Sequence, residues 1–147
     1  MKKDFIAEAL KQAKIAFEKD EVPVGAIIVE DGKIIALAHN HNLTLKDPTA
    51  HAEIVALRIA SEKKQTSRLD NCDLYVTLEP CTMCAAAISL ARIRRVYYCI
   101  NDEKFGAIEN GVRFFNNKSC HHKPEIYSGF SEKEAKELMT SFFKNKR

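Results

Sequence analysis

The sequence predicts an α/β fold in which a mixed β-sheet carries helices on both faces. Two apolar runs flank Asp31-Gly32, and an Asp-Gly pair between β-branched runs is a strong hairpin signal. After this hairpin, helical and strand-like segments alternate along the chain. A hairpin followed by such alternation predicts a sheet with both antiparallel and parallel pairs. In sheets of this kind, ligands bind where strands end and helices begin.

The composition is that of one globular domain, which we assign to residues 1–147. A chain of 147 residues can bury a sizeable core, and 46% apolar with 29% charged residues excludes a disordered chain. No apolar run approaches the roughly 20 residues that span a bilayer, and the N-terminal segment is amphipathic rather than a signal peptide. Five cysteines, an odd count, fit a reducing compartment, so we expect a cytoplasmic protein.

Three elements are expected before the first polar loop. Apolar residues recur at helical spacing from Asp4 to about Lys19, which predicts an amphipathic helix. The hairpin strands are Ala26–Glu30 and Lys33–Ala38. The first strand is almost entirely apolar and should lie centrally, covered on both faces. A polar loop from Asn40 to Asp47 follows.

The second half of the chain repeats the strand–helix order. A helix carrying His51 should have Asp47-Pro48-Thr49 as its cap and first turn. The helix Cys81–Leu90 is apolar on nearly every side, so the core or a second subunit must cover it. The other expected elements are strands at Asn71–Val76, Arg95–Ile100 and Glu125–Tyr127, an irregular region at Asn101–His122, and a last helix opened by a capping box at Ser131–Glu134.

The strongest chemical signal is the cysteine pair in Pro80-Cys81-Thr82-Met83-Cys84. Residues i and i+3 of a first helical turn share one face, so both sulfurs can reach a single atom. The positive end of the helix dipole favours thiolates, and two thiolates suit a soft divalent metal, zinc above all. The same spacing alone also fits a redox dithiol or half of a structural zinc site.

A histidine in Pro48-Thr49-Ala50-His51-Ala52-Glu53 favours a catalytic metal site. One histidine and two cysteines make three ligands and leave a fourth position for water, whereas structural zinc usually has four protein ligands. Glu53 does not face the same way as His51 on a helix, so it can act on that water. His-x-Glu with Pro-Cys-x-x-Cys is the known signature of zinc-dependent nucleobase deaminases.

The chain resembles the bacterial tRNA-specific adenosine deaminases of the cytidine deaminase-like superfamily over most of its length. The likeness rests on both zinc motifs and on Glu21–Ala26, Asp102–Ala107 and Phe142–Asn145. The zinc motifs identify only the superfamily, whereas Asp102–Ala107 and the basic Phe-Phe tail point to the tRNA-editing branch. The resemblance implies a three-layer α/β/α, cytidine deaminase-like fold with a mixed five-stranded sheet.

The resemblance also implies an activity and a set of site residues. The expected protein is a homodimer with one zinc per subunit that converts adenosine to inosine at the wobble position of a tRNA anticodon, with tRNA-Arg as the expected substrate. By position, the zinc ligands are His51, Cys81 and Cys84, and the catalytic proton shuttle is Glu53. The implied substrate-binding residues are Asn40, Ala50, Asp102, Lys104 and Phe143.

Side-chain exposure should decide which further residues touch RNA. Phe142 and Phe143 are adjacent on a helix and cannot both face one core, so one should pack and the other be free to stack on a base. His121-His122 stands where many family members have Asn-His, and we expect His121 to be an exposed loop residue. Basic residues also cluster at Arg92–Arg95 and Lys144–Arg147, although the net charge of +3 is too small to indicate RNA binding.

Two other functions fit the same residues. A deaminase of free bases such as guanine would use the same zinc site, and the basic tail argues against it. A non-catalytic RNA-binding module with structural zinc would need a fourth protein ligand, and Glu53 argues against it.

Overall fold

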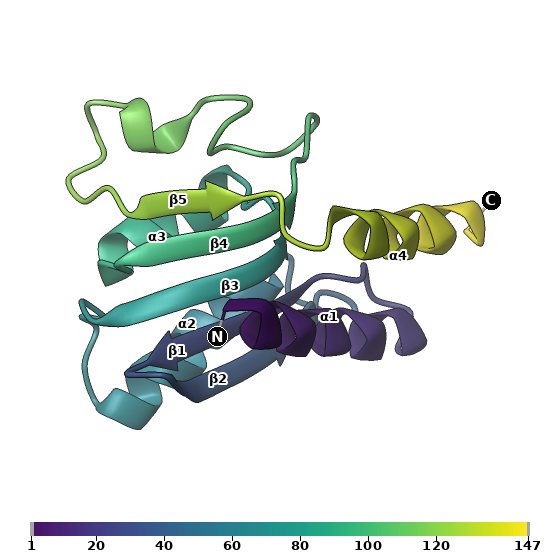
Figure 1. Ribbon diagram of the computed structural model, residues 1–147, viewed down its shortest axis with the longest axis horizontal. Coiled ribbons are helices and arrows are strands. Elements are labelled where there is room, and N and C mark those ends of the chain that lie inside the picture. Colours follow the sequence, from purple (N-terminus) through teal and green to yellow (C-terminus); the bar gives the residue numbers. More distant parts are fainter. Residues whose placement is uncertain (1, 147) are drawn as a thin grey trace.

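The computed structural model describes residues 2–146 and contains a five-stranded mixed sheet in the order β2-β1-β3-β4-β5 (Figure 1). The strands are β1 Gly25–Glu30, β2 Lys33–His39, β3 Cys72–Leu78, β4 Arg95–Ile100 and β5 Glu125–Ser128. The helices are α1 Lys2–Glu18, α2 Ala52–Lys64, α3 Thr82–Ala91 and α4 Glu132–Lys144, with a 3-10 turn, η1, at Phe114–Asn116. The predicted three-layer fold is confirmed.

Strand β1 runs against the other four strands of the sheet. It pairs antiparallel with β2 and with β3, whereas the β3–β4 and β4–β5 pairs are parallel. Strands β2, β3, β4 and β5 therefore share one direction, and their carboxyl ends meet at one edge, which we call the carboxyl edge. The segments that leave these four strands all begin there, so the topology gathers four distant parts of the sequence.

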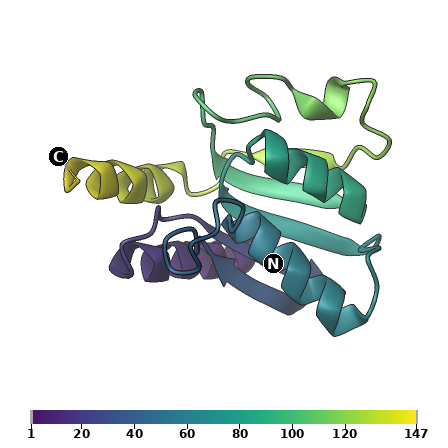
Figure 2. The ribbon, with the colours of Figure 1, turned by 180° about the vertical axis from the view of Figure 1, so that it is seen from behind.

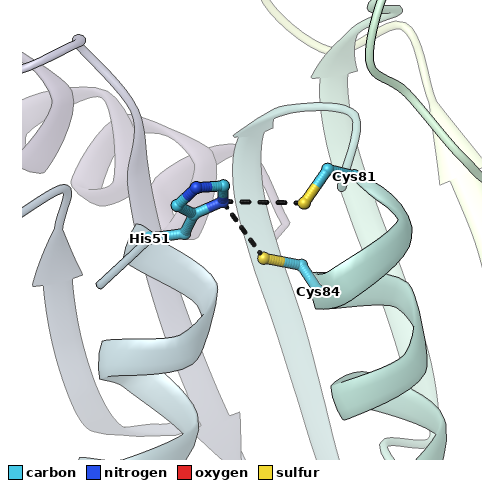
Figure 3. Close-up of side chains that lie close together, drawn as sticks. All are labelled: His51, Cys81 and Cys84. Atoms are coloured by element: carbon cyan, nitrogen blue, oxygen red, sulfur yellow. Dashed lines mark hydrogen bonds between the residues drawn. The ribbon is translucent and has the colours of Figure 1, made fainter. Parts of the chain in front are cut away.

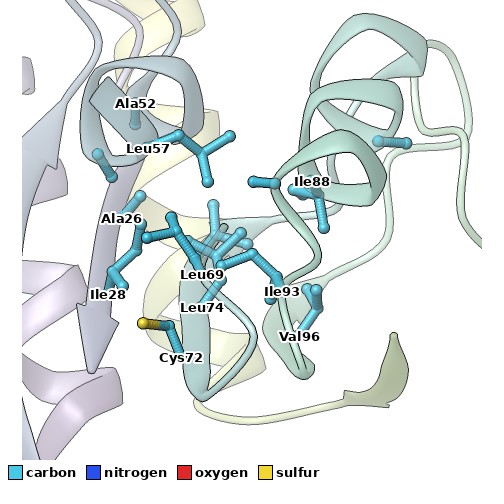
Figure 4. Packing of buried hydrophobic residues seen from close by; sticks show 14 of the residues in the cluster. Ala26, Ile28, Ala52, Leu57, Leu69, Cys72, Leu74, Ile88, Ile93 and Val96 are labelled. Atoms are coloured by element: carbon cyan, nitrogen blue, oxygen red, sulfur yellow. The ribbon is translucent and has the colours of Figure 1, made fainter. Parts of the chain in front are cut away.

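Helices cover both faces of the sheet. Helix α1 lies across one face, with α4 beside it and extending past the carboxyl edge (Figure 1). Helices α2 and α3 lie side by side on the opposite face (Figure 2). Between them and the sheet, Ile28 and Leu74 pack with Leu57 and Ile88 (Figure 4). None of the helices within residues 2–146 is long and apolar enough to cross a membrane.

The first hairpin has the central position and the turn that its residues predict. Ala26 and Ile28 belong to the core under α2 and α3, while Ile27 belongs to a second core that contains residues of α1 and α4. Strand β1 is therefore covered on both faces. The turn residues Asp31 and Gly32 have φ angles of 50° and 74°. Two positive φ angles are typical of the type I′ turn that joins twisted strands.

Helix α2 begins later than the sequence predicts, and the predicted cap at Asp47 is wrong. Asp47 Oδ1 accepts hydrogen bonds from the N–H and hydroxyl of Thr49, at 2.8 and 2.7 Å, and so closes a separate turn. The N-cap is His51, whose side chain makes no capping hydrogen bond. The N–H of Ala52 donates instead to Asn40 Oδ1 at 2.7 Å. A residue from the end of β2 thus caps α2.

The predicted capping box at Ser131–Glu134 is also wrong, although α4 begins at Glu132 as expected. Ser131 has a φ of 49°, and its side chain makes no hydrogen bond to the helix. A capping side chain needs an extended backbone, which a residue in the left-handed region does not have.

Helix α3 is covered on one side only by the described chain. Cys84, Ala85 and Ile88 are buried, but Leu90 is 82% exposed. The side of the helix away from the core, which we call the outer face of α3, consists of Met83, Ala86 and Leu90. The core of the described chain therefore covers only one side of this helix.

Gly25 at the start of β1 lies in close contact with α1 and generates a test of this packing. A Cβ there would lie 2.0 Å from the Ala9 carbonyl oxygen and 2.6 Å from the Ala13 nitrogen. Because these are backbone atoms, Gly25→Ala should lower the free energy of unfolding by roughly 3 kcal/mol, the upper end of the usual overpacking range. Gly32→Ala, whose Cβ meets nothing within 4 Å, should cost only about 1–2 kcal/mol for its left-handed backbone. Urea unfolding of both variants measures the difference, and equal midpoints would contradict this packing.

Candidate active site

Three side chains predicted to bind zinc lie together at the carboxyl edge (Figure 3). His51, Cys81 and Cys84 each offer one ligand atom, and these atoms all lie within 4.8 Å of one another. We call the three residues the ligand cluster. The Nδ1 atom of His51 is 3.6 Å from the Cys81 sulfur and 3.5 Å from the Cys84 sulfur.

Both helices that carry the ligand cluster begin at one of its members. His51 is the N-cap of α2 and Cys81 is the N-cap of α3, while Cys84 lies in the first turn of α3. The His51 side chain makes no capping hydrogen bond, and the Cys81 sulfur is hydrogen-bonded to Cys84 in the first turn of its own helix, so the imidazole and both sulfurs face a common centre. The dipoles of two helix N-termini make this centre electropositive, which favours thiolates.

The spacing of the ligand atoms fits a tetrahedral zinc ion. Usual Zn–S and Zn–N bond lengths at a tetrahedral angle place nitrogen and sulfur about 3.6 Å apart. The observed separations are 3.5 and 3.6 Å. Within residues 2–146, no fourth His, Cys, Asp or Glu belongs to the group. One nitrogen and two sulfurs are the donor set of an open, catalytic type of site rather than a closed structural one.

Hydrogen bonding and burial shift the pKa values of the three residues of the ligand cluster in different directions. Hydrogen bonding from the Cys84 thiol lowers the pKa of Cys81 to about 4, with His51 adding to the effect against the opposing influence of burial. The pKa of Cys84 is raised, because its thiol donates to Cys81 and is buried. The hydrogen bond with Cys81 raises the pKa of His51. Cys81 is therefore a thiolate at neutral pH, the form that binds a metal.

Glu53 lies beside the ligand cluster without belonging to it. Its side chain is buried, and its carboxyl group lies within hydrogen-bonding reach of the Cys84 sulfur. Burial raises the pKa of Glu53 to about 7. A carboxyl group that titrates near neutrality can both accept and donate protons at physiological pH. Glu53 thus has the location and the acidity expected of an acid–base group.

Asn40 and Ala50 form the backbone support of this site. Asn40 is buried, accepts the Ala52 N–H through Oδ1, and donates through Nδ2 to the Val22 carbonyl at 3.1 Å. An amide has two N–H bonds, so one remains for another acceptor. Ala50 is fully buried, and its carbonyl accepts the His41 N–H at 2.9 Å.

The other substrate-binding candidates follow β4 and β5 at the same edge. Asp102 begins the loop after β4, and Lys104 is exposed in that loop. Phe143 on α4 is 48% exposed, whereas Phe142 is buried and packs edge-on against Phe17. The prediction that one of the two phenylalanines packs and the other is free is confirmed.

In both the basic tail and the histidine pair, one residue is exposed and another has a partner within the chain. His121 is exposed as expected, while His122 Nε2 lies 2.7 Å from the Ile93 carbonyl oxygen. Lys144 is exposed, but Lys146 forms an ion pair with Asp20. The last basic residue of the predicted cluster, at position 147, lies outside the described residues.

A buried carboxylate to which the sequence assigned no role organises the loop after β4. Glu79 is 2% exposed and accepts six hydrogen bonds. The donors are the backbone N–H groups of Asp102, Ile108, Glu109 and Asn110 and the side-chain amides of Asn101 and Asn110. Burial alone would raise the pKa of Glu79, but these donors outweigh it and lower that pKa below its ordinary value.

Glu21 holds the loop after β2 in the same way. It is 1% exposed and accepts hydrogen bonds from the N–H groups of Leu43 and Thr44 and from the Thr44 hydroxyl. Glu21 belongs to a segment that carries the family resemblance, but neither that resemblance nor its position beside an apolar strand identifies its hydrogen-bond partners. Two buried acids therefore fix the two loops that flank the ligand cluster.

Comparisons with known proteins agree with this geometry. The MafB19-like deaminase family matches residues 2–147. A tRNA-specific adenosine deaminase from Agrobacterium fabrum is 55% identical over 143 residues, covering 97% of this chain and 94% of that protein. A solved structure from studies of A-to-I editing by tRNA:A34 deaminases at the wobble position of transfer RNA superposes with a TM-score of 0.91. It is 56% identical and covers 92% of this chain and 98% of its own.

A guanine deaminase from Bacillus subtilis is a more distant neighbour, with a TM-score of 0.65 and 41% identity over 67% of this chain and 63% of that one. The family match, by contrast, extends over nearly the whole sequence, and it includes every residue of the ligand cluster. The chain belongs to the MafB19-like deaminase family.

Proposed function

We propose that this chain is a single-domain, zinc-dependent tRNA adenosine deaminase that acts in the cytoplasm. It hydrolyses adenosine to inosine at position 34 of a tRNA anticodon, taking up water and releasing ammonia. The observation that carries the proposal is the near-complete match to tRNA deaminases, joined to a buried Glu53 in contact with the ligand cluster. tRNA-Arg is the substrate that we expect.

His51, Cys81 and Cys84 are the residues that would hold one zinc ion per subunit. Their nitrogen and sulfur spacing and the thiolate character of Cys81 support this assignment. When bound, zinc supplies Lewis-acid activation of a water molecule. Binding would require Cys84 to lose the proton that it shares with Cys81, and the electropositive N-termini of α2 and α3 favour that loss.

Glu53 carries the protons of the reaction. It accepts a proton from the attacking water and delivers it to N1 of adenine. It then takes the proton of the new hydroxyl group on C6 and passes it to the amine, which leaves as ammonia while C6 becomes a carbonyl carbon. A pKa of about 7 suits both directions of transfer. Its position next to the Cys84 sulfur places the carboxyl group within reach of the ligand cluster.

Each of the proposed substrate-binding residues suits a different chemical group of the RNA. The remaining N–H of Asn40 can reach a purine or ribose acceptor, and one oxygen of Asp102 is left for a ribose or base hydrogen. Lys104 offers a charge to phosphate, and the exposed ring of Phe143 offers a face to a base. Ala50 is fully buried, and its contribution to substrate binding would be the space that its small side chain leaves for the substrate.

The proposed activity is tested by incubating the wild-type chain with total tRNA and sequencing for inosine at position 34. We expect inosine there and no ammonia release from free guanine, the substrate of the rival function. Glu53→Gln should lower turnover by at least about 100-fold, the usual contribution of a general acid–base group, while it retains zinc and tRNA binding. Glu125→Gln, an exposed acid on β5, is the matched control. Guanine turnover without inosine would replace this function with the rival one.

We also propose that the protein works as a homodimer in which the outer face of α3 meets a second copy. The proposal rests on Leu90, a large apolar residue that is 82% exposed to water in the single chain. An interface between identical copies covers it without another partner.

Leu90→Asp should therefore weaken the dimer. An unpaired polar group at an interface costs about 2 kcal/mol or more, which corresponds to a dissociation constant raised by at least roughly 30-fold. Leu37→Asp, on the edge strand β2 and 44% exposed, should leave the dimer intact. Light scattering at micromolar concentration measures both. A wild-type monomer, or a Leu90→Asp dimer of unchanged affinity, would refute this interface.

A further inference from the structure

Phe105 is a large apolar side chain that the protein leaves in solvent next to the ligand cluster. Its side chain is 65% exposed, in the loop that follows β4. Single exposed apolar residues are common on protein surfaces, so exposure alone indicates nothing. The informative feature is how firmly the backbone beneath this ring is held.

Two carboxylates hold the turn that carries Phe105. Asp102 Oδ1 accepts the N–H of Lys104 at 3.1 Å and that of Phe105 at 3.0 Å. The N–H of Asp102 donates to the buried Glu79 at 3.0 Å, and the N–H of Gly106 donates to the Asp102 carbonyl at 2.8 Å. Hydrogen bonds before and after Phe105 in the chain thus fix its backbone, so the position of the residue is preorganised for binding.

The residue after Phe105 is paired with a member of the ligand cluster. Gly106 forms an isolated antiparallel bridge with Cys81. A Cβ on Gly106 would lie 2.4 Å from the Asp102 carbonyl oxygen and 2.5 Å from the Glu79 carboxyl carbon. Only glycine permits this approach, and it places Phe105 at the rim of the candidate active site.

Lys104 adds a positive charge to the ring. Its Nζ atom lies 5.4 Å from the centroid of Phe105. An aromatic face with an adjacent cation is the combination that single-stranded nucleic acids meet on their binding proteins, because the ring stacks on a base while the cation attracts phosphate. Lysine is depleted at the centres of protein–protein interfaces, which favours a nucleobase over a second copy of the chain.

We propose that Phe105 is a stacking platform for the nucleobase next to the adenosine that enters the site; this rests on the proposed tRNA deaminase function. A base reaches a buried site only by leaving its stack, and its neighbour then loses a partner. A ring fixed at the rim replaces that partner for any base, since every base has a π-face. Phe105 therefore adds a second aromatic contact, on the β4 loop, to that of Phe143 on α4.

Binding of an anticodon stem–loop RNA tests the proposal in a Glu53→Gln background, where the substrate stays intact. Adding Phe105→Ala should raise the dissociation constant roughly 5- to 150-fold, which corresponds to about 1–3 kcal/mol of stacking. The salt dependence should not change, because no charge is removed. Phe105→Trp should restore the affinity, and Phe105→Leu should not. Val112→Ala, 57% exposed elsewhere in the same region, is the matched control and should bind like the parent.

2-Aminopurine placed at each position of the RNA loop in turn locates the stacked base. Its fluorescence is quenched by stacking, so one position should be quenched by the parent and by Phe105→Trp but not by Phe105→Ala. Parent-like affinity and quenching in Phe105→Ala would overturn the proposal. A fall in oligomeric mass on light scattering would also overturn it, because the ring would then belong to an interface between copies.

Inosine formation by the wild-type chain separates this proposal from the proposed function. A wild type that edits tRNA while Phe105→Ala binds normally leaves the function in place and removes only the stacking platform. A wild type that neither binds nor edits tRNA overturns both.

Discussion

The antiparallel placement of β1 between β2 and β3 is the constraint on which the site depends. Because β1 alone is reversed, β2 and β3 run the same way and end at one edge. The helices that follow them both start at this edge and return over the same face of the sheet. Their N-termini therefore lie side by side, which brings His51 within hydrogen-bond distance of two cysteines about thirty residues away. A β1 that was antiparallel to only one of these two neighbours would make one of the helices start at the opposite edge.

At the carboxyl edge, the candidate catalytic groups and the candidate substrate-binding residues lie on different kinds of structure. The chemical groups stand at helix N-termini, where backbone geometry is regular and the local potential is positive. Apart from Phe143 on α4, the candidate substrate-binding residues lie on the loops after β2 and β4, which the hydrogen bonds of helices and strands do not hold. Buried acids supply the missing rigidity, Glu21 for the first loop and Glu79 for the second. Each takes backbone donors that would otherwise have no partner, so the loops are ordered before any substrate arrives.

The parts of the site that depend on one helical turn were predictable from the sequence. The i and i+3 spacing of Cys81 and Cys84 is a local signal, and the strands and helices follow their hydrophobic periods. The helix starts were less predictable, because Asn40 from another strand caps α2 in place of the expected Asp47. The six groups that donate to Glu79 belong to five residues that lie 22 to 31 positions away, and no spacing rule identifies them. Contacts between segments that are distant in the chain produce no regular spacing in the sequence, whereas motifs within one helical turn produce such a spacing.

Zinc K-edge X-ray absorption of the purified wild-type protein tests most directly the claim that two helix N-termini build an open metal site. We expect a four-coordinate zinc with two sulfurs at about 2.3 Å and two light atoms at about 2.0–2.1 Å. One light atom would be the His51 nitrogen and the other a non-protein oxygen, so Cys84→Ala should remove one sulfur from the shell or lose the metal. A shell of three or four sulfurs, or a wild-type protein that binds no zinc, would contradict this account.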